Sequence, residues 1–117
     1  MKKPSKPVTG ARASEVPEDA KAILIGLLAA IESANYSQFI AYGDAGFKAS
    51  LSEQQFSVVS GAVSPRLKKG YRSVSLGDLR QQGYKVYLWA LRFTDAGDDL
   101  LVLLSLKDGT VGGFSIQ

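Results

Sequence analysis

The sequence predicts an α+β domain in which N-terminal helices pack on a bent, cone-like antiparallel meander of four strands. Apolar residues recur at helical spacing up to about residue 70, whereas from residue 71 the hydrophobic period shortens toward two. Within residues 84–117, two long apolar runs are separated by turn-forming residues. One of these turns contains Asp108-Gly109, a dipeptide typical of tight hairpins because glycine accepts the positive φ that they require.

The chain has 117 residues, of which 45 % are hydrophobic, and this length suits one domain with a single core. We expect residues 1–13 to be a disordered basic arm, because they are rich in Pro and Lys and poor in large apolar residues. Residues 14–117 are expected to form the domain. The arm holds four basic residues, so the rest of the chain carries a net charge of −1. We therefore predict no nucleic-acid partner.

Membrane insertion is not predicted, because the longest apolar run, residues 22–31, is too short to span a bilayer. Localisation stays open. The sequence as it stands fits the cytoplasm, and a signal segment removed upstream of Met1 would instead mean export.

The first helix is predicted from about Pro17 to Ala34. Proline is tolerated in a first helical turn, and Glu18 and Asp19 complement the positive end of the helix dipole. Its core-facing stripe consists of Ile23, Leu24, Leu27, Leu28 and Ile31.

A short second helix is predicted over residues 36–42. Gly43 ends it, and a loop is expected to follow. Phe39, Ile40 and Phe47 are expected to point inward.

A third helix is predicted after Ser52, which lies three residues before Gln55 as in a capping box. Pro65 should kink or break this helix near residues 62–64, because proline lacks an N–H and clashes with the preceding turn. Gly70 should end it. The inward face is expected to contain Phe56, Val59, Val63 and Leu67.

Four strands are predicted over residues 71–82, 84–94, 100–107 and 111–117. The second strand is apolar on both faces, with Tyr87, Trp89, Leu91 and Phe93 on one and Tyr84, Val86, Leu88 and Ala90 on the other. Helices can cover only one face, so we predict a homodimer through the other.

Three helices are followed by a meander that ends in the motif Gly109-Thr110-Val111-Gly112-Gly113-Phe114. In this order of elements, and in residues 35–39, 47–48, 51–56, 67–70 and 83–84, the chain resembles the nuclear transport factor 2-like superfamily. The nearest likeness is to small bacterial domains of unknown function, over about residues 18–117. The resemblance implies a cone with a cavity between helices and sheet, in a superfamily that includes isomerases, dehydratases, transport adaptors and exported accessory domains. No catalytic residue of such enzymes has a match here.

Catalysis is disfavoured by composition. The chain has neither Cys nor His, so it lacks the commonest general base and the commonest transition-metal ligand, and we predict no metal site and no cofactor. Asp78 is a weak catalytic candidate, because a carboxylate inside the cone would have a raised pKa. Gly77 beside it suggests a bulge that would instead turn Asp78 toward solvent or Arg80.

Three further groups have alternative interpretations. Asp95, Asp98 and Asp99 suit a turn better than a cation site. Arg66, Lys68 and Lys69 suit a helix C-terminus better than an anion site. Tyr36, Tyr84, Tyr87 and Trp89 are weak candidates for a ligand pocket, since their rings offer apolar contact with a polar tip, and the alternative is core packing.

The sequence thus favours a noncatalytic binding or interaction domain with a cavity for a small apolar ligand. The alternative is a small isomerase- or lyase-type enzyme that uses an acidic residue in the cone.

Overall fold

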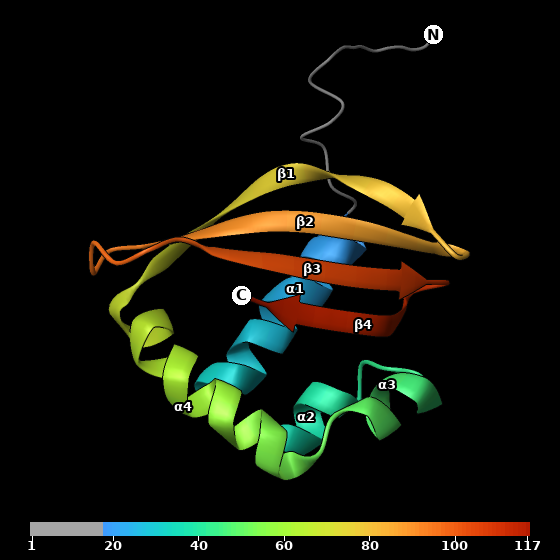
Figure 1. Cartoon of the computed structure of the whole chain (residues 1–117), viewed down its shortest axis with the longest axis horizontal. Helices are drawn as coiled ribbons and strands as arrows, with labels where there is room; N and C mark the ends of the chain where they lie inside the picture. The colour runs from blue at the N-terminus through green and yellow to red at the C-terminus, as the bar shows by residue number, and fades with distance from the viewer. Residues whose placement is uncertain (1–17) are drawn as a thin grey trace, which may run out of the picture.

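The computed structural model describes residues 18–117, which form four helices followed by four strands (Figure 1). This confirms the predicted α+β class and the four-stranded meander. The predicted arm, residues 1–13, lies outside the described residues. The elements are α1 Glu18–Glu32, α2 Tyr36–Ile40, α3 Ala45–Ser50, α4 Glu53–Lys69, β1 Tyr71–Gln81, β2 Tyr84–Phe93, β3 Leu100–Lys107 and β4 Thr110–Ile116.

Local side-chain caps start three of the helices, α2, α3 and α4. Asn35 Oδ1 accepts a hydrogen bond from the Gln38 N–H at 3.1 Å and caps α2. The capping box predicted for α4 is confirmed, because Ser52 and Gln55 each accept a hydrogen bond from the backbone N–H of the other. No helix within residues 18–117 is long and apolar enough to cross a membrane.

The loop predicted after Gly43 was wrong, because six of its residues form α3. Asp44 starts this helix by accepting a hydrogen bond from the Phe47 N–H at 2.8 Å. As predicted, Phe47 is buried in the core. Residues 18–117 therefore contain four helices in place of the predicted three.

Of the two outcomes predicted at Pro65, a kink or a break, the break was wrong, since α4 continues through it to Lys69 (Figure 1). Pro65 deprives the Gly61 carbonyl of its helical donor. Both residues are solvent-exposed, so water can satisfy that carbonyl. Burial of Phe56, Val63 and Leu67 holds the opposite side of the helix on the core.

The sheet is antiparallel, with strand order β1-β2-β3-β4. Gln82-Gly83 and Asp108-Gly109 form the tight turns, and all four residues have positive φ, between 52° and 85°. This confirms the Asp108-Gly109 hairpin. The bulge predicted at Gly77 is confirmed by a register shift between Ser75 and Gly77.

The two faces of the sheet have different surroundings. Helix α1 crosses behind β2, β3 and β4 in Figure 1 and covers one face. The buried residues of that face include Tyr87, Trp89, Leu91, Val102 and Leu104. None of the described helices crosses the other face, which we call the open face (Figure 1).

Candidate functional site

An apolar pocket of about 240 Å³ lies where α1, α2 and α4 meet the last strand. Its helical wall comes from core residues and from the segment that joins α3 to α4. Its strand wall is formed by three consecutive residues of β4. The lining residues are Ile31, Phe39, Leu51, Phe56, Val59 and residues 114–116.

Aromatic contacts hold the wall of this pocket in place. The Phe39 ring lies 5.0 Å from that of Phe56 and 5.6 Å, edge-on, from that of Phe114. The Tyr36 ring packs on Phe56 at 5.6 Å, and its hydroxyl donates to the Leu51 carbonyl at 2.5 Å. Because that hydroxyl already has an acceptor, Tyr36 stiffens the pocket from outside. No charged side chain lines the pocket.

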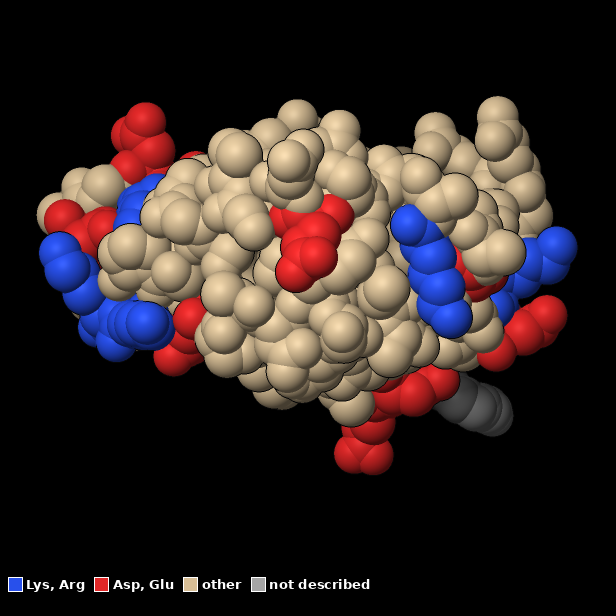
Figure 2. Space-filling view, turned by 90° about the horizontal axis from the view of Figure 1, so that it is seen from below, with Lys and Arg blue, Asp and Glu red and all other residues tan. Residues whose placement is uncertain are grey.

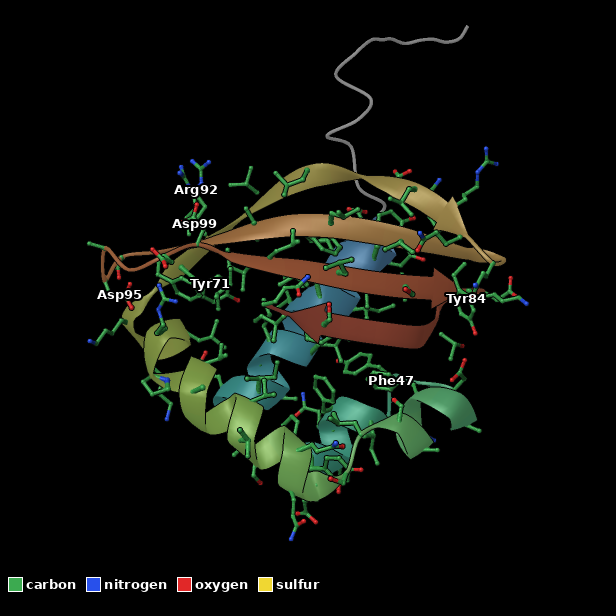
Figure 3. All side chains as sticks on the ribbon, in the orientation of Figure 1. Phe47, Tyr71, Tyr84, Arg92, Asp95 and Asp99 are labelled. Atoms are coloured by element: carbon green, nitrogen blue, oxygen red, sulfur yellow. The ribbon has the colours of Figure 1, made fainter. Side chains whose placement is uncertain are left out.

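The four predicted ligand residues do not come together. Tyr36 lies behind the pocket wall, whereas Tyr87 and Trp89 are buried core residues with ring centroids 6.0 Å apart. Tyr84 lies at the end of the sheet near the tight turns, far from Asp95 at the opposite end (Figure 3). Its hydroxyl donates to Asp44 Oδ2 at 3.3 Å.

Asp78, the weak catalytic candidate, is solvent-exposed, with its carboxylate 3.9 Å from Lys85 Nζ. Its cross-strand neighbour Tyr87 has a raised pKa, mainly because the phenol is desolvated and secondarily because Asp78 is nearby. An exposed carboxylate beside a lysine lacks the desolvated setting that a general base of raised pKa needs. Nothing in this arrangement favours the enzyme alternative.

At the other end of the sheet, Arg66 of α4 and Asp95 of the β2–β3 turn form a clamp. Arg66 donates from Nε and Nη2 to the two oxygens of Asp95, at 2.8 and 3.2 Å, and from Nη2 to the Asp98 carbonyl at 2.7 Å. The guanidinium also lies 4.0 Å from the centre of the Phe93 ring. The clamp joins the β2–β3 turn to the last turns of α4. Because the guanidinium of Arg66 makes these contacts, we assign Arg66 a structural role. Within residues 18–117, no group of three or more acidic side chains is placed to hold a metal ion.

The clamp predicts a specific pH dependence of stability. Hydrogen bonds from Arg66, and then from the Gly97 N–H, lower the pKa of Asp95 to about 2, below its usual value near 4. Folding thus favours the ionised carboxylate, so this contribution is present above about pH 4 and is lost as the pH falls toward 2. In urea unfolding, the parent should be more stable than Asp95→Asn at pH 6, and the gap should close near pH 2. Asp98→Asn keeps the carbonyl that Arg66 uses and should show no such closing gap. Equal pH profiles for Asp95→Asn and the parent would contradict the clamp.

A larger hollow, of about 490 Å³, lies between the two tight turns at the Tyr84 end of the sheet. Charges of both signs line it, among them Arg80, Lys85, Lys107 and Asp108, and all four residues are solvent-exposed. Exposed side chains of this kind do not preorganise a site, so the larger volume alone does not make this hollow the better candidate site. Figure 2 views the side formed by α2, α3 and α4, where Lys and Arg stand toward the ends beside Asp and Glu. That side has no continuous basic surface for a polyanion.

The pocket residues were missed as a site, although Phe39, Phe56 and Val59 were correctly assigned to an inward face. The Gly112-Gly113-Phe114 ending was the one signal near its strand wall. Gly112 has a packing reason, because a Cβ there would lie 2.2 Å from the Tyr84 ring. Comparison of the chain with protein-family models and with curated proteins gave no match.

Proposed function

We propose that this is a noncatalytic binding domain that takes a small apolar group into the pocket between α1, α2, α4 and β4. The observation that carries the proposal is the composition of that wall: aliphatic and phenylalanine side chains around a space of about 240 Å³, with Ser115 as the polar member. Apolar walls of this kind favour transfer of a hydrocarbon group out of water. No ionisable side chain lines the pocket that could carry acid–base chemistry.

We also propose membership of the nuclear transport factor 2-like superfamily, near its small bacterial domains. Helices followed by a meander, with a pocket between them, support this assignment. Because folds of this type host unrelated functions, the binding proposal rests on the pocket and not on the family.

The proposed partner is a second copy of the chain, bound through the open face of the sheet. Val86 on that face is 5 % exposed although it lies outside the helix-packed core. The same face carries the half-buried side chains of Leu88, Ala90, Leu101 and Leu103. Leu76 and Leu79 on β1 are more exposed. An apolar face of this kind on a sheet without a helical cover favours self-association.

A substitution on α4 that fills the pocket with a larger side chain tests the binding proposal. Toluene is the probe. Its binding to the full chain is monitored through the amide NMR shifts of Ile31, Phe114 and Ile116 and the methyl shifts of the two isoleucines. Val59 is half-buried in the pocket wall, so Val59→Trp should occupy the space and weaken toluene binding at least tenfold. Val58 is 74 % exposed, so Val58→Trp adds the same ring outside the pocket and should leave binding unchanged.

The two variants should have the same circular dichroism spectrum as the parent. A difference in toluene affinity then reflects the pocket and not a loss of folding. If toluene shifts the pocket signals equally in Val59→Trp and in the parent, the ligand lies elsewhere and the proposal fails.

A further inference from the structure

The outer edge of β4 carries backbone groups that no described strand uses beyond residue 111. The Gln117 N–H and C=O both bond to Leu101, at 2.9 and 2.7 Å. In an antiparallel ladder such doubly bonded pairs alternate with pairs whose N–H and C=O point outward. The register pairs Ile116 with Val102 and Phe114 with Leu104, so both β4 residues fall in the outward class. Their N–H and C=O groups face the free edge.

The first part of this edge already holds a piece of chain. The Val111 N–H donates to the Tyr42 carbonyl at 3.0 Å, and the Asp44 N–H donates to the Val111 carbonyl at 2.9 Å. Gly43 thereby forms a parallel bridge with Val111. The pairing stops there because Asp44 caps α3 and the chain turns away from the edge. Within residues 18–117, Phe114 and Ile116 have no such partner segment.

The apolar pocket reaches this edge. Side chains of a strand alternate between the two faces of its sheet, so a pocket confined to one face would touch every second residue. Here Phe114, Ser115 and Ile116 all line the pocket. The space therefore extends around the edge of β4, where the unpaired backbone groups lie.

The size of the pocket narrows the class of ligand. Its volume of about 240 Å³ is below the roughly 300–1,000 Å³ of sites that enclose a whole small molecule. It suits one apolar side chain, and the remainder of the ligand must bind outside it. The adjacent edge offers hydrogen bonds of the kind that an extended chain makes.

We propose that the free edge of β4 binds an extended peptide segment that inserts one large apolar side chain into the pocket. This rests on the proposed function, since it uses the same pocket. The peptide continues the line of pairing that residues 42–44 begin at Val111, with main-chain hydrogen bonds to Phe114 and Ile116. Because no charged residue lines the pocket, the inserted side chain is uncharged.

Peptides of matched sequence test the proposal on the full chain. The probe acetyl-KTTFTTK-amide places one phenylalanine between strand-forming threonines, and N-acetylphenylalanine amide supplies the same side chain on a single residue of main chain. If the peptide forms two or more edge hydrogen bonds beyond those open to the single residue, it should bind at least about tenfold more tightly than N-acetylphenylalanine amide. Two N-methylated peptides complete the set, one methylated at the phenylalanine and one at the two threonines beside it. Alternate amides point to opposite edges, so one version should lose about tenfold in affinity and the other should not.

The outcomes separate the two proposals. Equal binding of the peptide and N-acetylphenylalanine amide, or equal effects of the two methylation patterns, would overturn the edge proposal while leaving the pocket function intact. If neither probe shifts the pocket signals and toluene does not either, both proposals fail.

A pair of protein variants gives an independent readout. Ile116→Ala and Ile116→Pro both truncate the side chain, but the proline also removes an N–H that points away from β3. Proline is tolerated at such positions of an edge strand. Peptide affinity should therefore be lower for Ile116→Pro than for Ile116→Ala, with equal affinity for toluene, which has no amide group to pair with the edge. Equal peptide affinities for the two variants would overturn the edge proposal.

Discussion

Replacing Leu27 by alanine should lower the free energy of unfolding by about 2–5 kcal/mol, as for other fully buried leucines. Leu27 is 0 % exposed, at the centre of the α1 stripe that covers the sheet. Truncation loses the apolar burial of the side chain and leaves a cavity that the surrounding helix and strands cannot collapse to fill. Urea unfolding followed by circular dichroism measures the change.

Ile25, two residues away on the same helix, is the matched control because it is 51 % exposed. Ile25→Ala should change stability by no more than about 0.5–1 kcal/mol, since surface substitutions are usually mild. If Leu27→Ala is as stable as Ile25→Ala, the buried face of α1 has been assigned to the wrong side.

Features of the fold that depend on local chemistry were predictable from the sequence. The capping box at Ser52 and the Asp108-Gly109 turn each depend on residues within a few positions of one another. Alternation along residues 84–93 correctly separated the core face of Trp89 from the open face of Leu88. These signals need no knowledge of distant contacts.

The two errors arose where tertiary packing decides. Six residues are too few for a stable helix in isolation, and α3 forms because Asp44 caps it and Phe47 packs on Phe39 at 5.6 Å. Pro65 weakens α4 locally, but the buried stripe that includes Val63 and Leu67 keeps the helix continuous. The helix propensities of single residues do not report either contribution, because both depend on packing between elements.

The pocket was beyond sequence reasoning for a geometric reason. Four elements leave a space between their side chains, and no spacing within one element reports it. Polar-tipped aromatics were the natural candidates, yet Tyr36 and Tyr84 already bond to Leu51 and Asp44. The strand wall of the pocket instead includes Phe114 and Ile116. Their backbone groups face a free edge because β4 is the last strand in the sheet order.

A charge placed on each face of β2 should have opposite consequences and thereby test the proposed dimer. Trp89 is 1 % exposed in the helix-covered core, so Trp89→Lys should unfold the chain, because an isolated buried ammonium has no compensating partner. Leu88, the next residue, points to the open face, so Leu88→Lys should leave the fold intact. Circular dichroism distinguishes these two states.

Sedimentation of the same proteins at micromolar concentration reports the assembly. We expect the parent to be a dimer and Leu88→Lys to be a folded monomer, because two copies of the new charge would be buried against apolar partners across the interface. Leu103 is the cross-strand neighbour of Leu88, so Leu103→Lys should have the same effect through a different strand. A parent that sediments as a monomer would rule out the dimer at this concentration. If the parent and both variants are all dimers, the interface does not lie on the open face, because each lysine must then lie in solvent.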